Sequence, residues 1–433
     1  MGQVVDINSA GSGKRRPTRD GDRTETGPGG SARGRRSRRP RTALVLGGGG
    51  LTGAVYEIGA LRALDLLAVN KTVNDFDIVV GTSAGAFVGA LTANGITPEQ
   101  MMRVVNQQDD SSFPPISLGH LLRPNIGEFV RKGIALPWKG LSVLRELAPR
   151  IGQFSIMDVA IGLAEGLPAG LYTGEGVERY VRTVLSDDGR TDDFRELRCE
   201  LYLVATDLDT CERIVFGAEG WDDVPISTAV RASTALPMVY NPVEVRDRVL
   251  VDGGLVSTTN LDIAVEAGAE FIVVVNPLVP YINDYTDRVR GLFGSRPRHV
   301  SDMGLPQIGY QAFKMMAYQR LHEMAKSWEE RYPGVDIILV EPEPDDELMF
   351  STSIMNFSKR VEIARHGFQS VTLRLADEYD RWKEVCDRHG IRISAERVRQ
   401  VVKHFAAEQE KGSAWRKILE RPTRTLLRQS GTS

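Results

Sequence analysis

The feature that most constrains the fold is a strand, a glycine-rich turn and a helix in direct succession, which occurs twice near the start of the chain. In the first copy, the uncharged residues 42–46 suit a strand buried on both faces, and four glycines follow at 47–50. Apolar residues then recur every three or four positions over 54–67, which is the spacing of a helix. The second copy has a strand at 77–80 and a glycine turn at 81–85 that opens a helix of small residues.

Apolar runs later in the chain indicate that strands and helices continue to alternate. The further predicted strands lie at 201–205, 213–216, 249–251, 271–275 and 336–340. Helical spacing predicts two long helices, at 306–331 and 356–382. Strands that alternate with helices form a mostly parallel sheet covered on both faces. The expected fold class is therefore α/β, with three layers (α/β/α), a mostly parallel central sheet and an inserted cap region.

Composition divides the chain into four parts. Residues 1–41 hold 11 Lys/Arg, 4 Asp/Glu and almost no aromatic side chains, so we expect a disordered basic N-terminal arm. The main α/β domain is expected at 42–345. Within it, the proline-rich residues 109–170 break the alternation and suggest a cap. A C-terminal helical region is expected at 346–410, followed by a basic tail at 411–433.

The sequence also argues against several classes of protein. The N-terminus has no apolar run like that of a secretory signal, and no stretch approaches the roughly 20 apolar residues of a membrane-spanning helix. We therefore expect a cytoplasmic protein that meets membranes at the surface. Cys199, Cys211 and Cys386 are widely spaced, and no metal-binding motif such as H-E-x-x-H occurs, so no disulfide framework, metal or cofactor is expected.

The basic ends of the chain bear on possible partners. Arginine pairs in the arm suit anionic lipid headgroups or nucleic acid, but a solvated tail is the simpler interpretation. We expect peripheral contact with an anionic membrane as one use of these ends and do not expect a nucleic-acid partner. None of these features specifies an oligomeric state.

The residues Gly81-Thr82-Ser83-Ala84-Gly85 fit the motif G-x-S-x-G, in which a sharp strand-to-helix turn presents a serine hydroxyl at the carboxyl edge of a sheet. The backbone of such a serine is strained and crowded, so the positions two before and two after it must lack side chains. The helix that follows also points its positive N-terminal end at the reacting centre. Ser83 is therefore a candidate nucleophile.

The first glycine turn allows two interpretations. Gly48, Gly50 and Gly53 match the G-x-G-x-x-G pattern of a dinucleotide site, with Asp75 or Asp77 as the acid for the ribose. As an oxyanion hole, the same loop would offer backbone amides to a tetrahedral acyl intermediate, each worth roughly 3 to 4 kcal/mol. Because the serine turn follows in the next unit, both turns should open at the same sheet edge. That arrangement favours the oxyanion hole.

The third element is Asp252-Gly253-Gly254, which follows the predicted strand at 249–251. An aspartate at a strand end can bring its carboxylate to another group at a strand edge, here Ser83. An ordinary Asp-Gly turn is the alternative. A conventional triad would need a histidine instead, and those that follow the aspartate are His299, His322, His366, His389 and His404. Their segments have the pattern of polar loops or helix surfaces, so an aspartate base is preferred.

Together the three elements resemble the patatin-like phospholipases. The glycine loop, G-T-S-A-G and D-G-G occur in that family's order and at comparable separations. Residues 232–243, Ala-Ser-Thr-Ala-Leu-Pro-Met-Val-Tyr-Asn-Pro-Val, resemble the family's third block almost residue for residue. Residues 201–210 resemble another of its strands, and the whole resemblance covers residues 42–276.

The resemblance implies a three-layer α/β/α fold and hydrolysis of lipid acyl esters, of the phospholipase A, lysophospholipase or esterase type, without a cofactor. A lipid or phospholipid would be the substrate. Carried onto this sequence, it implies that Ser83 is the nucleophile and Asp252 the base. It also implies that the amides of Gly48, Gly49 and Gly50 are the oxyanion donors.

The chain departs from the family's pattern at Thr52, where an Arg or Lys often stands, so a positive side chain is not available there. Other glycines support the motifs by allowing close backbone approach, namely Gly53, Gly81, Gly85, Gly253 and Gly254. Acyl transfer to an alcohol other than water would use the same Ser83 intermediate. A non-catalytic lipid-binding or regulatory protein is the alternative from another class, and the intact serine, aspartate and glycine loop argue against it.

Overall fold

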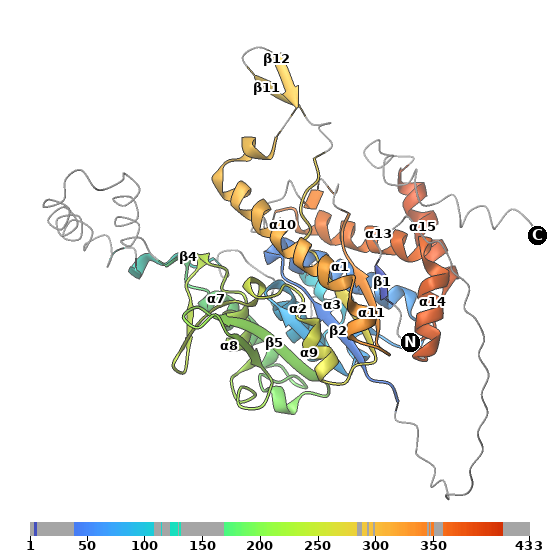
Figure 1. Cartoon of the computed structure of the whole chain (residues 1–433), viewed down its shortest axis with the longest axis horizontal. Helices are drawn as coiled ribbons and strands as arrows, with labels where there is room; N and C mark the ends of the chain where they lie inside the picture. The colour runs from blue at the N-terminus through green and yellow to red at the C-terminus, as the bar shows by residue number, and fades with distance from the viewer. Residues whose placement is uncertain are drawn as a thin grey trace, which may run out of the picture.

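The computed structural model describes residues 4–6, 39–107, 114, 122–128, 130, 169–283, 288–291, 294–297, 299–343, 346, 348–349 and 358–409. Within these residues the centre of the molecule is a nine-stranded sheet with the order β1-β13-β10-β2-β3-β5-β9-β8, and β6 pairs with β5 (Figure 1). Its strands are β1 (Val4–Asp6), β2 (Thr42–Leu46), β3 (Ile78–Thr82), β5 (Glu200–Asp207), β6 (Arg213–Phe216), β8 (Val243–Val245), β9 (Arg248–Asp252), β10 (Phe271–Val275) and β13 (Asp336–Val340).

The sheet is mostly parallel, as predicted. Strands β1, β13, β10, β2, β3 and β5 run in one direction, whereas β6 and β9 are antiparallel to β5 and β8 is antiparallel to β9. The predicted strands at 213–216, 271–275 and 336–340 match β6, β10 and β13 to the residue. The central strands β2 and β10 are uncharged, mostly apolar runs, and every one of their residues is buried because both faces of the sheet are covered there.

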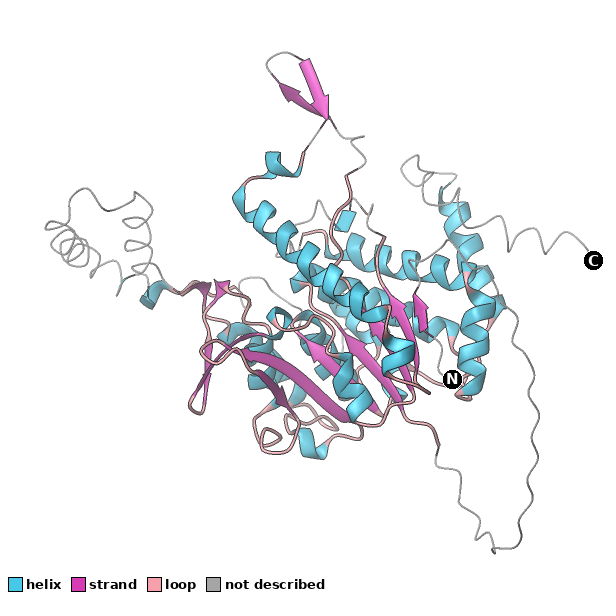
Figure 2. Cartoon of the chain, in the orientation of Figure 1, coloured by secondary structure: helices cyan, strands magenta, loops and turns pink. Residues whose placement is uncertain are grey.

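Alternate residues of each strand face two separate cores. Leu44 and Leu46 of β2 belong to one core, and Ala43 and Val45 belong to the other. The first core is covered by α1 (Gly50–Leu67), α2 (Ala84–Ala93), α3 (Pro98–Val105), α7 (Glu175–Leu185), α8 (Ile226–Ser233), α13 (Arg360–Asp377), α14 (Tyr379–Arg388) and α15 (Ala395–Gln409). The second is covered by α9 (Leu261–Glu266), α10 (Leu305–Ala325) and α11 (Trp328–Arg331). The predicted three layers are thus present (Figure 2).

The C-terminal helices pack directly on α1. A side chain at Gly59 would lie 2.2 Å from the carbonyl oxygen of Ala364, and one at Gly367 would lie 2.6 Å from that of Tyr56. Glycines at these positions therefore let α1 and α13 cross in backbone contact. The single helix predicted at 356–382 is wrong, because the chain breaks between α13 and α14. Helix α13 ends at Asp377 and α14 begins at Tyr379, and Trp382 of α14 is buried in the first core.

Small elements complete the described chain. Strand β4 (Gly170–Tyr172) pairs with β7 (Met238–Tyr240), and β11 (Arg288–Gly291) pairs with β12 (Gly294–Pro297) in a hairpin. The 3-10 turns are η1 (Val73–Asp75), η3 (Phe194–Glu196), η4 (Gly253–Leu255) and η5 (Val300–Met303). None of the helices that the structure describes is long and apolar enough to cross a membrane.

The N-terminal arm differs in part from its expected disorder. Val4–Asp6 forms β1, which extends the sheet by pairing in parallel with β13. Two consecutive valines favour a strand once an unpaired strand edge is available. The rest of the arm up to residue 38, most of the cap at 109–170 and the tail at 411–433 lie outside the described residues.

Candidate active site

Ser83 occupies the sharp turn between β3 and α2. Its backbone angles are φ 55° and ψ −115°, a conformation that non-glycine residues rarely adopt and that costs energy to hold. A side chain at Gly81 would lie 2.5 Å from the carbonyl oxygen of Gly85, and one at Gly85 would lie 2.2 Å from that of Leu46. Both positions therefore require glycine, as the motif predicts.

The Ser83 hydroxyl donates a hydrogen bond to Asp252, with Oγ 2.5 Å from Oδ2. The other carboxylate oxygen, Oδ1, accepts the amide of Gly254 at 2.8 Å. Ser83 and Asp252 are both buried, with 7% and 3% of their surface exposed. Their strands flank β5 on either side, so the two side chains meet over β5.

Burial shifts the protonation equilibrium of Asp252. Removal of the carboxylate from water raises its pKa to about 6, and the hydrogen bonds from Ser83 and Gly254 offset part of that rise. Among the described residues, no Lys, Arg or His forms an ion pair with Asp252. The carboxylate is therefore more basic than an ordinary aspartate and hydrogen-bonded to one hydroxyl, which suits a general base.

Two polar side chains hold the serine turn in place. The Ser83 amide donates to Ser233 Oγ at 2.9 Å, and that hydroxyl donates to the carbonyl of Val204 in β5 at 2.6 Å. Asn260 donates to Thr82 Oγ1 at 3.0 Å from a left-handed backbone conformation, φ 48°. The sequence prediction missed both supports. Ser233 lies in the block at 232–243 that resembles the family, and this is the sequence signal that could have indicated its role.

The glycine loop faces the serine turn. The space where Gly48 would carry a side chain lies 3.5 Å from the Cβ of Ser83. The carbonyl of Gly47 accepts the amide of Gly85 at 2.9 Å, which joins the two turns. The predicted convergence of these turns at one edge of the sheet is therefore present.

The amides of the loop are not equivalent. Gly48 donates to the carbonyl of Thr258 at 3.1 Å, so this predicted oxyanion donor is already used within the protein. Within the described part of the chain, the amides of Gly49 and Gly50 donate no backbone hydrogen bond, which leaves them for an external acceptor. Gly49 must be glycine because a side chain would lie 2.9 Å from the Pro277 ring.

The remaining motif positions are also close-packed. A side chain at Gly53 would lie 3.1 Å from Pro277, and one at Gly253 would lie 2.3 Å from the Val204 carbonyl oxygen. Thr52, where the family often has a cation, is buried in the first turn of α1. That site suits a small side chain better than a long charged one.

An apolar pocket opens beside the Ser83 hydroxyl. It encloses about 1040 Å³, counting the open solvent at its mouth. Its walls come from α1, α2, α7, β7 and α10, and include Val55, Phe87, Val177, Tyr240 and Phe313. Of the described residues that line it, Asp252 alone is charged. A pocket of this kind accommodates a long apolar chain and keeps water from the reacting groups.

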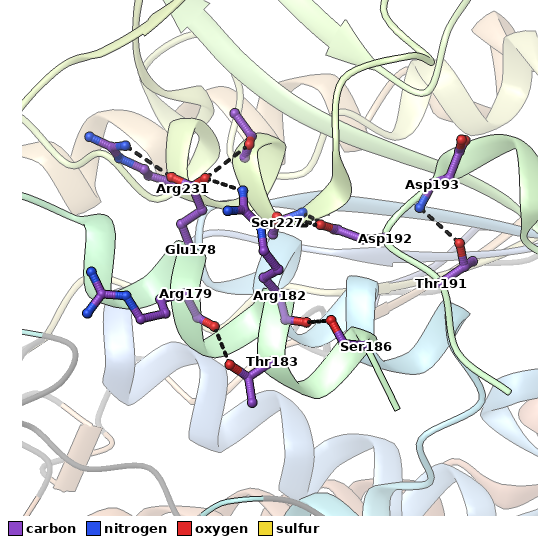
Figure 3. A network of polar contacts seen from close by, with 11 residues as sticks. Glu178, Arg179, Arg182, Thr183, Ser186, Thr191, Asp192, Asp193, Ser227 and Arg231 are labelled. Carbon is purple, nitrogen blue, oxygen red and sulfur yellow. Dashed lines mark hydrogen bonds and ion pairs between the residues drawn. The ribbon is translucent and has the colours of Figure 1, made fainter. Parts of the chain in front are cut away.

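A polar network clamps the helices that support this wall (Figure 3). Glu178 of α7 accepts hydrogen bonds from Arg182 at 2.5 Å and from Arg231 of α8 at 3.0 Å. Asp192 accepts the amide and hydroxyl of Ser227 at 2.6 and 2.7 Å. The network fixes α8, which carries Ser233, against α7.

Among the described residues, no histidine hydrogen-bonds to Ser83 or Asp252. Nε2 of His322 contacts Glu341 at 2.9 Å, that of His389 contacts Asp336 at 2.7 Å, and that of His366 contacts Asp346. His299 and His404 are exposed. His366 is buried, so the prediction of a surface position for it is wrong: its pairing with Asp346 permits burial.

The dinucleotide interpretation fails on topology. The amide of Asp77 donates to the carbonyl of Thr42 at 3.0 Å, at the start of β2, whereas the glycine loop follows the end of β2. Asp75 lies in η1, next to the same edge. A ribose-binding acid must share an edge with the phosphate loop, and neither aspartate does.

The fold and the site define the class: a three-layer α/β/α protein whose glycine loop and G-x-S-x-G serine turn meet at one edge of the sheet. Comparison with known proteins identifies its family. The family model of patatin-like phospholipases matches residues 44–265, more than half of the chain. The protein belongs to the patatin-like phospholipase family.

Individual relatives are distant. The chain is 22% identical to a probable lipid hydrolase of Invertebrate iridescent virus 6 over 229 residues, which are 52% of this chain and 63% of that protein. It is 26% identical to an NTE family protein of Mycobacterium tuberculosis over 244 residues, which are 56% of this chain and 50% of that protein. The chain thus matches less than two thirds of the length of either relative.

Among solved structures, the chain is similar to VipD from Legionella pneumophila, with 14% identity, a TM-score of 0.33, and coverage of 78% of this chain and 67% of VipD. It is also similar to human group IVD cytosolic phospholipase A2, with 11% identity, a TM-score of 0.34, and coverage of 83% and 60%.

Proposed function

We propose that the protein is a serine lipid acyl hydrolase that cleaves carboxylic esters through an acyl-enzyme on Ser83, with Asp252 as the base. The observation that carries this proposal is the 2.5 Å hydrogen bond from the Ser83 hydroxyl to a buried aspartate of raised pKa, beside the glycine loop. Membership of the patatin-like phospholipase family supports the same conclusion.

Acylation begins when Ser83 Oγ attacks the ester carbonyl carbon while its proton moves to Asp252 Oδ2. The carbonyl oxygen becomes an oxyanion, which the amides of Gly49 and Gly50 stabilise by roughly 3 to 4 kcal/mol each. The tetrahedral intermediate then collapses. The bond to the alcohol breaks, and the departing oxygen takes the proton from Asp252.

Deacylation repeats these steps with water. A water molecule gives its proton to Asp252 and attacks the acyl carbon, the same amides hold the new oxyanion, and the bond to Ser83 Oγ breaks. The serine oxygen recovers the proton from Asp252. The product is a carboxylic acid, which at neutral pH leaves as a carboxylate.

The substrate class follows from the pocket. Its apolar walls suit a fatty acyl chain, and no Lys, Arg or His is among the described residues that line it, so these residues do not attract an acidic group to the serine. A dry pocket also keeps the Asp252 pKa raised, because bound lipid would exclude water in the same way as the protein does. We therefore propose a lipid ester, with the acyl chain in this pocket.

Covalent labelling tests the proposal. The parent chain should react with a long-chain fluorophosphonate probe, whereas Ser83→Ala should not react and Asp252→Asn should react much more slowly. Variants in which one of His299, His322, His366, His389 or His404 becomes alanine should label at near the parent rate. Equal labelling of the parent and Ser83→Ala, or loss of labelling in a folded histidine variant, would reject the assignment.

A further inference from the structure

Helix α10 is apolar on two faces over its first half. Its inner face contributes Tyr310 and Phe313 to the wall of the pocket. Its outer face carries Ile308, Met315 and Met316, whose side chains are 43%, 56% and 73% exposed. A helix that only covers a core presents polar residues to water, so this exposed apolar stripe indicates contact with something other than water.

The second half of the same helix has the ordinary pattern. Gln319, Arg320 and Glu323 continue the outer face there and are exposed, while Leu321 and Ala325 are buried in the second core. The apolar outer stripe is therefore confined to the half of α10 that also lines the pocket. This location ties the stripe to the site and not to the general packing of the helix.

A basic hairpin precedes α10 in the chain. Strands β11 and β12 pair in antiparallel register, with Gly291 opposite Gly294, and together they carry Arg288, Arg290 and Arg296. Figure 1 shows this hairpin extending from the body of the molecule beyond the start of α10. Isolated two-stranded hairpins are marginal in water, so a projecting basic one suits a partner that carries negative charge.

The wall of the pocket formed by β7 also has an exposed apolar edge. Met238 begins β7 with a φ of 67° and 82% of its side chain exposed, and Tyr240 of the same strand lines the pocket. The paired strand β4 adds Leu171, which is 53% exposed. Exposed apolar side chains thus adjoin the pocket on the β7 wall as well as on α10.

We propose that the outer stripe of α10 and the β11–β12 hairpin dock on the surface of an anionic lipid bilayer, so that the pocket opens toward the lipid. This inference rests on the proposed function. An acyl chain that leaves a bilayer can then reach Ser83 without crossing water, because the stripe and the pocket lie on two faces of one half-helix. The sequence of the hairpin contains three arginines, whose charge is opposite to that of anionic headgroups, and the stripe inserts at the level of the acyl boundary.

Vesicle binding by the full chain tests the docking surface. Ser83→Ala serves as the background so that lipid is not consumed, and flotation is measured with vesicles of phosphatidylcholine alone and with phosphatidylglycerol added at three parts in ten. We expect binding to the anionic vesicles that weakens as salt is raised. Changing Arg288, Arg290 and Arg296 to serine should weaken the affinity for anionic vesicles by roughly 100-fold, since each basic residue near a membrane surface raises the affinity about fivefold.

Matched controls make the same kinds of substitution at exposed positions outside the proposed docking surface. The charge control changes the same number of exposed arginines on the C-terminal helical side to serine, namely Arg381, Arg392 and Arg399. The apolar test variant is Met315→Ser with Met316→Ser, and its control is Val69→Ser with Val361→Ser, at side chains that are 46% and 45% exposed. We expect the controls to bind like the background and the methionine variant to bind about tenfold more weakly. Equal binding by test and control variants would overturn the proposal, as would no binding to either kind of vesicle.

A soluble short-chain ester distinguishes this inference from the proposed function. With Ser83 restored, the hairpin variant should hydrolyse the monomeric ester at the parent rate and lose activity only on anionic vesicles. If Ser83→Ala hydrolysed the soluble ester as fast as the parent, the catalytic proposal would fail, whatever the vesicles showed. If the hairpin variant lost the soluble and vesicle activities together, the docking role of the arginines would be rejected.

Discussion

The amino and carboxyl edges of the central sheet each hold an aspartate, but their surroundings differ. At the amino edge, Asp77 precedes β3 and accepts hydrogen bonds from the Arg39 guanidinium at 2.5 Å and from the Thr42 amide at 2.9 Å. At the carboxyl edge, Asp252 is hydrogen-bonded only to uncharged donors, the Ser83 hydroxyl and the Gly254 amide. One carboxylate is neutralised by a cation, and the other is not.

The pKa values of the two groups move in opposite directions. Partial burial alone would raise the pKa of Asp77, but the Thr42 amide and the Arg39 guanidinium outweigh it, and the pKa falls below its usual value. Burial raises the pKa of Asp252 to about 6. The same fold thus uses one aspartate to hold strands together and keeps the other in a state that costs stability and suits chemistry.

The largest expected difference between the edges is in turnover. Asp252→Asn should lower kcat/KM on a soluble ester by about 10⁴-fold, because the amide cannot take the Ser83 proton. Asp77→Asn should change it by less than about threefold, since Asp77 lies at the opposite edge from Ser83. Steady-state assays on both variants at pH 8 give the comparison. Similar losses in both would mean that the edges do not divide the roles in this way.

The next effect is on stability and has the opposite sign. Asp252→Asn should raise the free energy of unfolding by about 3 kcal/mol at pH 8, because the folded parent must hold an ionised carboxylate that is buried without a cation. The aspartate ionises near pH 4 in the unfolded chain and near pH 6 in the folded protein. The parent therefore loses stability as the pH rises from about 4 to about 6, whereas the variant does not. The gain should vanish below about pH 4. Urea unfolding at several pH values measures it, and a destabilised variant at pH 8 would contradict the raised pKa.

A smaller effect is expected on the pH dependence of the parent enzyme. If ionised Asp252 is the base, kcat/KM on the soluble ester should fall about tenfold between pH 7 and pH 5, with a midpoint near 6. An aspartate with an ordinary pKa near 4 would leave the rate flat over this range. Asp77 does not contribute, because its pKa is lowered. A flat profile, with the fold intact by circular dichroism, would mean that the base titrates below pH 5.

Short-range patterns of the sequence predicted the carboxyl edge well. The glycine loop and the Ser83 turn each follow a buried strand directly, and a parallel sheet brings consecutive units to one edge. The sequence did not indicate that β9 runs antiparallel to β5, although the strand end carrying Asp252 was identified. It also missed Ser233 and the carbonyl of Thr258, because these contacts join segments far apart in the chain.

The contacts at the amino edge were predicted less well, again because they join segments that are far apart in the chain. Asp77 was considered as a ribose ligand, yet its partners are Thr42 and Arg39, whose positions depend on the register of β2 beside β3. The pairing of His389 and Arg388 with Asp336, which joins α14 to β13, was likewise unpredicted. Periodicity indicates which face of an element is buried but not which distant charges meet there.

The smallest predicted effect completes the comparison. Asp77→Asn should lower the free energy of unfolding by about 1 kcal/mol at neutral pH, because the three hydrogen bonds that its carboxylate accepts from Arg39 and Thr42 weaken at a site that remains partly exposed to solvent. A group of lowered pKa contributes stability above its unfolded pKa, and that contribution disappears as the pH falls through the folded value. The loss in this variant should therefore shrink on acidification, just as the gain in Asp252→Asn does, but from the opposite sign. The exposed Asp188→Asn is the control and should be neutral. If Asp77→Asn stabilised the protein at neutral pH, as expected for Asp252→Asn, the two aspartates would have the same effect on stability. The proposed difference between the two edges of the sheet would then be rejected.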